Sequence, residues 1–484
     1  MIARKELYDK IPDGPDEVIK RDGRRVAFDL MRIVNAIDRA GRSTGELKQE
    51  ESIRLGALVA GRVAQMDAKL PPDVEAIQDA VEVALMEAGH HKTAKAYILY
   101  RERHAAMRDK VEEAQVNMIR EYLDEMDWST RENCNMTYSL QGLNHYLSSK
   151  ISRAFWMYEI YGPHVRRAHE SGDFHVHDTN LVSSYCVGWD LYQLLQEGFR
   201  GVSGKTAAAP AKHFRAALGQ CVNFLYTMQG EAAGAQAFSN VDTLLAPFIR
   251  HDGLSYEEVK DAMQAFIFNM NTPTRVGFQS PFTNVTLDLT VPRHYARQPV
   301  LIGGELRDSC YGDYQAEVDL FNRAFFEIMD EGDAEGRLFS FPIPTLNLTR
   351  SFDWDNPNLE PMWRMTGKYG IPYFSNFINS DMSEEDARSM CCRLRIDNTQ
   401  LAMKGGGLFG SHPLTGSIGV VTINLPRLGH LAEDREDFFN RLNALMDLAR
   451  DSLEKKRMLI ERLTHEGLYP YTRHYLRHIY ERFG

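Results

Sequence analysis

The spacing of apolar residues in the first hundred positions predicts a short hairpin followed by several helices. The dipeptide Asp22-Gly23 is typical of a tight hairpin turn. After Asp29, apolar residues recur at helical spacing, as Leu30, Ile33, Val34 and Ile37. Helices are expected over four stretches: from Leu30 onwards, about 49–66, about 73–88, and from near Thr93 through Arg103. The pattern therefore predicts a small, mainly helical first domain.

Beyond position 170, short β-branched runs alternate with long helical patterns. Helices are expected over three stretches: Val241–Ile249, Ser255–Asn271 with Ser255 as its cap, and about 432–465. Short strands are expected at the end of the polar stretch 269–287, within 341–348 and within 372–377. Strands separated by long helices favour an α/β architecture over a β-sandwich.

The composition changes this picture only by excluding some classes of protein. A chain of 484 residues is expected to hold more than one domain. Its net charge of −11 argues against a nucleic-acid polymer as partner, although small phosphorylated ligands remain possible. No apolar run approaches the ~20 residues that cross a bilayer, and the first residues do not form a signal peptide. We therefore expect a cytoplasmic protein without a membrane partner.

Candidate chemistry centres on Met390–Asp397, where Cys391 and Cys392 are adjacent in a chain with six cysteines. Adjacent cysteines are hard to join without distorting the peptide between them, so two thiols are the default interpretation. No CxxC pair exists, so a four-thiolate zinc site has no ligands in this sequence. We interpret this segment as the carrier of a catalytic thiol.

Three other stretches are candidates for a site or an interface. His175 and His177 are expected on one face of a strand, either as substrate-shaping or structural residues or, with Asp178, as a metal site. The polar, turn-rich stretch 269–287 is of the kind that holds ligands. The small residues of 230–240 suggest close packing of helices, and Cys186 is expected to be buried.

The first domain resembles the ATP-cone, a regulatory nucleotide-binding module, through the pattern Val-x-Lys-Arg-x-Gly…Phe-Asp. The resemblance implies that residues 1–108 bind ATP or dATP, with Lys20 and Arg21 at the phosphates. The residues implied to contact the nucleotide are Val18, Lys20, Arg21, Lys92, Tyr97 and Arg101. A basic turn on a helical bundle with no ligand is the alternative.

The whole chain resembles the anaerobic (class III) ribonucleotide reductases, which are glycyl-radical enzymes. The motifs that carry this resemblance are the ATP-cone, the histidine strand, the loop 271–284, Met390–Arg393 and Ile423–Pro426. The implied fold is a ten-stranded-type α/β barrel over residues 109–484, here C-terminally incomplete. The implied activity is the reduction of ribonucleoside triphosphates to 2′-deoxyribonucleoside triphosphates for DNA synthesis, regulated by nucleotides.

The resemblance also implies roles for single residues. Cys392 is the expected thiyl residue, with Cys391 as the alternative, Cys186 is the second active-site thiol, and Asn424 holds a ribose hydroxyl. Substrate-shaping residues are His175, His177, Asn271, Thr272 and Arg275. A dNTP specificity-effector region at a dimer interface is implied for Glu231, Gln236, Asn240 and Asp242. No metal ligand is expected.

The sequence departs from this family at its C-terminal end. The radical-bearing Arg-x-x-Gly-Tyr loop and the family's zinc cysteines are absent, and 364–370 resembles that loop only superficially. The glycyl radical is therefore expected from a missing part or a separate subunit, generated by a radical SAM activating enzyme. Formate or a thioredoxin-like protein is the expected reductant. The alternatives are a catalytically inactive nucleotide-binding regulator and a glycyl-radical enzyme with another substrate.

Overall fold

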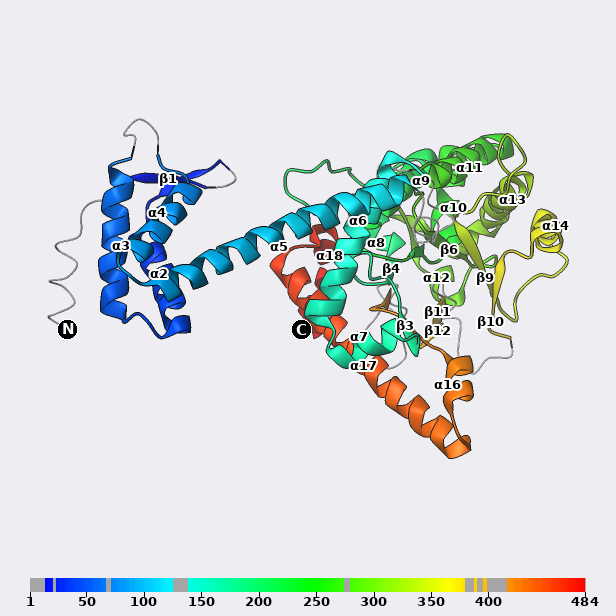
Figure 1. Cartoon of the computed structure of the whole chain (residues 1–484). Helices are drawn as coiled ribbons and strands as arrows, with labels where there is room; N and C mark the ends of the chain where they lie inside the picture. The colour runs from blue at the N-terminus through cyan, green and yellow to red at the C-terminus, as the bar shows by residue number, and fades with distance from the viewer. Residues whose placement is uncertain are drawn as a thin grey trace. The chain divides into compact units, whose positions relative to one another are not determined.

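The chain forms two compact units, Met1–Leu123 and Asp124–Gly484, in a computed structural model (Figure 1). The structure describes residues 14–20, 23–66, 71–124, 138–273, 279–378, 387–389, 395–397 and 416–483. Each unit has its own hydrophobic core.

The first unit is a two-stranded hairpin with four helices, as its sequence predicts. Its elements are β1 (Glu17–Ile19), β2 (Arg25–Ala27), α2 (Leu30–Thr44), α3 (Gln49–Ala64), α4 (Val74–Glu87) and α5 (His91–Leu123). Asp29 caps α2 by accepting a hydrogen bond from the amide of Met31, so the expected start of this helix is confirmed. Helix α5 extends 20 residues beyond Arg103, because Glu102–Leu123 contains neither glycine nor proline to stop it.

The second unit alternates helices with short strands. Its helices are α6 (Leu140–Phe155), η2 (Trp156–Ile160), α7 (Pro163–Glu170), α8 (Leu191–Glu197), α9 (Phe214–Met228), α10 (Val241–Asp252), α11 (Tyr256–Asn271), α12 (Arg293–Ala296), η3 (Tyr311–Tyr314), α13 (Gln315–Glu331), η4 (Pro357–Leu359), α14 (Glu360–Tyr369), α16 (Leu425–Leu431), α17 (Arg435–Glu466), α18 (Pro470–Tyr475) and α19 (Arg477–Phe483). Its strands are β3 (Phe174–Val176), β4 (Cys186–Trp189), β5 (Gln236–Phe238), β6 (Thr283–Leu287), β7 (Pro299–Ile302), β8 (Glu305–Cys310), β9 (Ile343–Leu348), β10 (Tyr373–Asn376), β11 (Ala387–Ser389), β12 (Arg395–Asp397), β13 (Gly416–Ser417) and β14 (Val421–Ile423).

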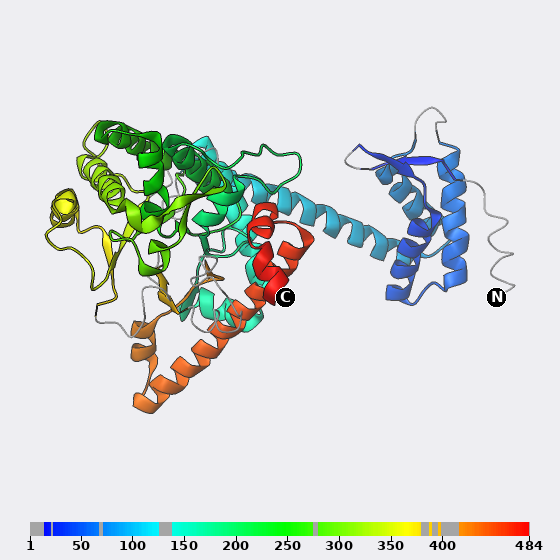
Figure 2. The ribbon, with the colours of Figure 1, turned by 180° about the vertical axis from the view of Figure 1, so that it is seen from behind.

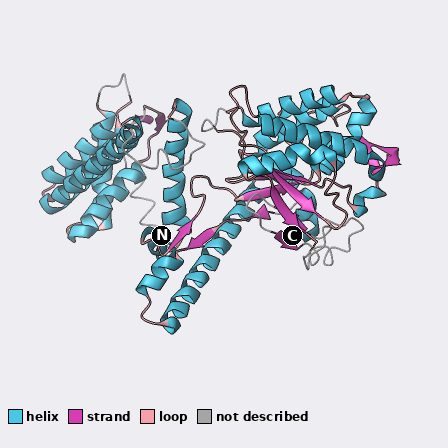
Figure 3. Ribbon diagram, turned by 90° about the vertical axis from the view of Figure 1, so that its right-hand side faces the viewer, coloured by secondary structure: helices cyan, strands magenta, loops and turns pink. Residues whose placement is uncertain are grey.

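A six-stranded sheet in the order β10-β9-β6-β5-β4-β13 organises this unit. The first five strands in this order are parallel, and β13 pairs antiparallel with β4. The sheet curls like half of a barrel, and helices gather on one side of it (Figure 3). The predicted α/β barrel class is therefore confirmed.

The main core lies between this sheet and the helices α9, α10, α11 and α13. Alternate strand residues supply one side of it, including Trp189, Phe238, Val285 and Leu346. Ser255 forms a capping box with Glu258 at the start of α11, which confirms the predicted cap. Because the apolar face of the sheet is buried against these helices, only the opposite face can form a site.

A second, smaller core holds α7, α17 and the β3–β14 pair around Trp156. The predicted C-terminal helix is confirmed as α17, which begins after the cap Asp434. Residues 435–450 of this helix contain no buried side chain, and with α16 this part projects from the unit (orange in Figure 2).

The expectation that the small residues of 230–240 pack helices together is wrong. Residues 236–238 form the strand β5, inside the sheet. A Cβ atom on Gly234 would lie 2.8 Å from the ring of Tyr185 and 2.9 Å from Sγ of Cys186. The small residues therefore let the chain pass close to Cys186 rather than let helices approach.

Candidate active site

The six-stranded sheet carries a buried polar face opposite its apolar core. Because successive strand residues point to opposite faces, residues that alternate with the core members Val285 and Leu346 face away from the core. This polar face consists of Cys186, Asn284, Thr286, Thr345 and Asn347, all of them buried. A polar ligand bound to this face of the sheet would lie on the same side as the thiol of Cys186.

Cys186 begins β4 and has a relative exposure of only 1%. Its Sγ accepts a hydrogen bond from the amide of Ala235 at 3.3 Å. Across the sheet it pairs with Ser417 of β13. The expected burial of this cysteine is confirmed, and the contacts fix its thiol at the edge of the polar face.

Two polar atoms on the polar face lack hydrogen-bond partners among the described residues. Asn284 donates from Nδ2 to the carbonyl of Ile343 at 2.9 Å and to the hydroxyl of Thr345 at 3.0 Å. Its Oδ1 and the hydroxyl of Thr286 have none. Since buried polar atoms are usually paired, these two suit a ligand that brings hydroxyl groups.

We did not select Asn284, Thr286, Thr345 and Asn347 as site residues from the sequence. The sequence did contain a signal for them. Asn284 and Thr286 are separated by one apolar residue, as are Thr345 and Asn347, and both strands are buried on both faces. Such a strand is ordinarily apolar throughout, so polar residues at alternate positions mark a face with a function.

His175 and His177 lie beside each other, as the sequence predicts, and a third ring joins them. The ring centroids of His175 and His177 are 4.6 Å apart, and His169 of α7 lies 5.1 Å from His175. His177 Nε2 is 2.8 Å from the hydroxyl of Thr422. Burial lowers the pKa of His169 to about 4, helped by Arg153 and the other two histidines.

Lys456 of α17 is a buried cation that we did not identify from the sequence. Its relative exposure is 2%, and its Nζ lies 5.5 Å from the ring centroid of Trp156. Burial lowers its pKa, whereas Asp178 and Cys186 act in the opposite direction. The signal was its helical spacing from the buried residues Ser452, Leu459 and Ile460, which places it on the apolar stripe.

Asn424 caps α16 instead of standing alone as a ligand group. Its Oδ1 accepts from the amide of Arg427 at 3.1 Å, and its Nδ2 donates to the carbonyl of Gly172 at 3.0 Å. Both ends of the amide are therefore used within the chain. A contact with a ribose hydroxyl would have to share or replace these hydrogen bonds.

Four of the predicted residues lie outside the described residues, namely Arg21, Arg275, Cys391 and Cys392. Asn271 joins the end of α11 to the segment before β9, because its side chain exchanges hydrogen bonds with the backbone of Phe341. The hydroxyl of Thr272 donates to the carbonyl of Phe268. Both side chains therefore make hydrogen bonds to the backbone at or near the end of α11.

The structure buries three of the four predicted effector residues. Gln236 accepts from the indole of Trp189, and Asn240 donates to Asp288. Asp242 accepts from backbone amides of Thr243, Asp288 and Leu289, and burial raises its pKa. As placed, these three cannot touch a soluble nucleotide directly. Glu231 accepts from the amides of Tyr471 and Thr472 at the start of α18.

In the first unit, the predicted ATP contacts are divided between core and surface. Val18 and Tyr97 belong to one buried cluster, and Lys20 directly follows β1 in the hairpin turn. Lys92 is exposed in the first turn of α5. The guanidinium of Arg101 binds the carboxylates of Glu75, Asp79 and Glu82, so it is already occupied here.

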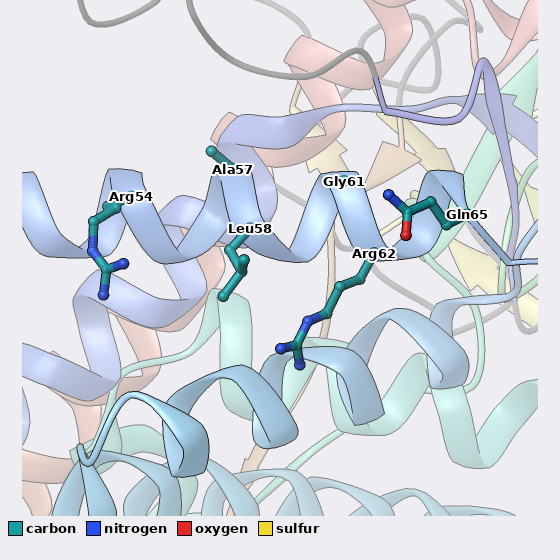
Figure 4. Close-up of a pocket in the computed structure, with 6 residues that line it drawn as sticks. All are labelled: Arg54, Ala57, Leu58, Gly61, Arg62 and Gln65. Atoms are coloured by element: carbon teal, nitrogen blue, oxygen red, sulfur yellow. The ribbon is translucent and has the colours of Figure 1, made fainter.

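A surface pocket of about 460 Å³ lies along α3, lined by Arg54, Ala57, Leu58, Gly61, Arg62 and Gln65 (Figure 4). It includes none of the predicted ATP contacts. Its two cations are paired with carboxylates, Arg54 with Glu51 and Arg62 with Glu87. We therefore assign no ligand to it.

Within the described ranges, no group of three or more His, Cys, Asp or Glu side chains is arranged to hold a metal ion. No helix in the same part of the chain combines the length and apolar character needed to cross a membrane.

Comparison with known proteins agrees with this geometry. The chain is 23% identical over 479 residues to the anaerobic ribonucleoside-triphosphate reductase of Haemophilus influenzae, covering 90% of this chain and 62% of the relative. Over 110 residues it is 39% identical to a ribonucleoside-diphosphate reductase subunit alpha of Chlamydia muridarum, covering 20% of this chain and 10% of that one. The chain thus spans less than two thirds of the first relative's length.

The fold is also that of a solved relative. The anaerobic ribonucleotide reductase from Thermotoga maritima, crystallised with dATP and CTP, matches with a TM-score of 0.54 and 20% identity, covering 76% of this chain and 63% of that one. A model of the ATP cone domain matches residues 16–106. A family model described as anaerobic ribonucleoside-triphosphate reductase matches residues 132–484, which is most of the chain. The chain belongs to the anaerobic ribonucleoside-triphosphate reductase family.

Proposed function

We propose that this chain binds ribonucleoside triphosphates on the polar face and takes part in their reduction to 2′-deoxyribonucleoside triphosphates. The observation that carries the proposal is the buried thiol of Cys186 on the same face of the sheet as Asn284 and Thr286. Oδ1 of Asn284 and the hydroxyl of Thr286 have no hydrogen-bond partner among the described residues, and they suit the hydroxyl groups of a ribose. Family membership supports the same reaction.

In this proposal two thiols act on opposite sides of the ribose. Cys392, as a thiyl radical, abstracts the 3′ hydrogen, and the 2′ hydroxyl leaves as water. Cys186 supplies an electron and a proton, and formate or a thioredoxin-like protein supplies the remaining reducing equivalent. A glycyl radical generated by a radical SAM activating enzyme would supply the radical to Cys392.

We further propose that residues 1–108 bind ATP or dATP and that dNTP effectors act at a dimer interface near residues 231–242. The match of the ATP cone domain supports the first part. Lys20 and Lys92 lie outside the buried cluster and remain candidates for direct contact with the nucleotide, whereas Val18 and Tyr97 lie within that cluster. The buried Gln236, Asn240 and Asp242 would act by holding the adjoining strands and helices in place.

The test is an anaerobic reconstitution with a glycyl-radical segment and an activating enzyme. We expect ribonucleoside triphosphates to be reduced, and we expect Cys392→Ser and Cys186→Ser each to lose at least about a thousandfold in rate, as removal of an essential reacting group does. Cys310→Ser, at a half-buried position outside the polar face, is the matched control. Reduction that survives Cys392→Ser would contradict the assignment of the thiyl residue. Nucleotide binding without reduction in the wild type would favour the regulator.

A further inference from the structure

A buried cluster of charged side chains adjoins Cys186, and the roles proposed above do not use it. Among the described residues, Lys456 is the one buried lysine or arginine. The titratable groups that face it are His177 and Asp178 after β3 and Cys186 on β4, with His175 next to Asp178. Lys456 therefore interacts with three titratable side chains, those of His177, Asp178 and Cys186.

The backbone makes room for this lysine at a single position. A Cβ atom on Gly419 would lie 3.2 Å from Cδ of Lys456 and 3.5 Å from its Nζ. Gly419 follows Ser417 by two residues, and Ser417 is the cross-strand partner of Cys186. Ser417 also donates to the carbonyl of Gly419 at 3.1 Å. The turn after β13 thus lets α17 bring an ammonium group to Gly419, two residues after the cross-strand partner of Cys186.

Asp178 has the features of a counter-ion held in place by its backbone. It adopts φ = 55°, a left-handed conformation that few residues other than glycine take. Its Oδ2 is buried and has no hydrogen-bond partner among the described residues. Burial raises its pKa, and the charges of Lys456 and His175 oppose that rise. A buried carboxylate oxygen without a hydrogen-bond partner is stabilised by a nearby cation.

We propose that Lys456, with Asp178 as its counter-ion, is a positioning residue that stabilises the thiolate form of Cys186. In this step the S–H bond of Cys186 breaks, the electron pair stays on sulfur, and the proton passes to the buffer. An ammonium close to a buried thiol favours the charged form, which burial alone disfavours. The catalytic consequence rests on the proposed function, because a thiolate is the better electron donor on its side of the ribose.

The experiment follows the thiol directly and needs no turnover. Full-length protein labelled with ¹³C at the cysteine Cβ is titrated by NMR, and Cys186→Ser identifies the resonance of Cys186. We expect Lys456→Met to raise the midpoint of the Cys186 titration by about one unit or more, since a nearby opposite charge shifts a titration by about one to three units. Lys456→Arg keeps the charge and should stay closer to the wild type.

Two further variants separate this role from a merely structural ion pair. Lys455→Met removes the adjacent lysine, which pairs with Asp451 on the surface at 2.8 Å, and should leave the midpoint unchanged. Asp178→Asn removes the counter-ion, so the midpoint should fall below that of the wild type. A general loss of packing is not expected to raise the Cys186 midpoint in Lys456→Met and lower it in Asp178→Asn.

An unchanged midpoint in folded Lys456→Met, judged by its near-UV circular dichroism, would overturn the proposal. If that variant does not fold, an unchanged or higher midpoint in Asp178→Asn would overturn it instead. A wild-type Cys186 that does not titrate below about pH 10, well above an ordinary thiol, would do the same. None of these outcomes depends on nucleotide reduction, so the proposed function and this inference fail separately.

Discussion

At the scale of single residues, three neighbouring histidines show how burial changes the pKa of a side chain. His169, His175 and His177 form a row of rings, and burial lowers the pKa of His169 to about 4 and also lowers the pKa of His177. Nδ1 of His169 accepts a hydrogen bond from the amide of Val176 at 3.1 Å, which holds β3 against α7. Protonation of that nitrogen would break the contact, so this residue links stability to pH.

We predict that stability falls as the pH is lowered from 6.5 to about 4, in part because of His169. Its pKa is 6.5 in the unfolded chain and about 4 in the folded one, so the unfolded state binds more protons in this window. The stabilisation is present above pH 6.5 and is lost as the pH falls through the folded value. One proton contributes a slope of at most about 1.4 kcal/mol per pH unit.

His169→Asn tests this prediction, because the Asn side-chain oxygen can replace Nδ1 as acceptor but cannot be protonated. Urea unfolding of both proteins between pH 7 and pH 4 gives the slopes. The variant should lose less stability than the wild type across this range. Equal slopes would show that other groups carry the dependence. His478→Asn, on an exposed side chain, is the control.

At the scale of elements, the short helix α18 depends on a carboxylate from a distant loop. Glu231 accepts from the amides of Tyr471 and Thr472 at 3.0 and 2.7 Å. These amides lie at the start of a helix, where backbone N–H groups lack partners and favour a negative charge. Tyr475 of the same helix is buried against Trp189 and Phe224. The segment after α17 is therefore docked by one charged anchor and one aromatic anchor.

We predict that Glu231→Ala lowers the free energy of unfolding by about 1.5–3 kcal/mol, the range for hydrogen bonds to a charged group. Urea denaturation with a fluorescence readout measures it. Glu305→Ala is the matched control, because Glu305 is 76% exposed in its side chain and makes only a 3.8 Å ion pair with Arg307. An unchanged stability together with a lost dNTP response would instead support a direct effector contact for Glu231.

At the scale of the whole molecule, each of the two units has a hydrophobic core of its own. The first unit builds its core from its own hairpin and helices, with Val18 and Tyr97 inside it. The second unit has separate cores for the sheet and for the β3–β14 pair. Because each unit is stabilised internally, a ligand of the first unit should stabilise that unit whatever happens on the polar face.

We predict that ATP raises the unfolding temperature of the first unit in the full-length chain and that Lys20→Ala weakens ATP binding about tenfold or more. Loss of a hydrogen bond to a charged group accounts for that size. Calorimetry gives the affinity and the stabilisation. Lys48→Ala, an exposed lysine before α3, should bind like the wild type. Equal affinities in Lys20→Ala and the wild type would remove Lys20 from the nucleotide site.

Local patterns were enough to predict the elements. Several predicted features depend on residues close in sequence, and the structure confirms them: the helix start after Asp29, the cap Ser255, the apolar spacing after Leu30 and the strand runs near 345 and 375. The burial of Cys186 also followed from its apolar neighbours. The small residues of 230–240 were misread, because glycine and alanine allow close approach in a sheet as readily as between helices.

The sequence by itself therefore determined the α/β class, several helix starts, the paired histidines and the family resemblance. Only the tertiary structure decided that Asn284, Thr286 and Cys186 share one face, that Asn424 caps a helix, and that Lys456 lies against Gly419, two residues after the strand partner of Cys186. The physical reason is range. Periodicity and capping act within a few residues, whereas 270 positions separate Lys456 from Cys186, and only strand pairing and core packing bring them together.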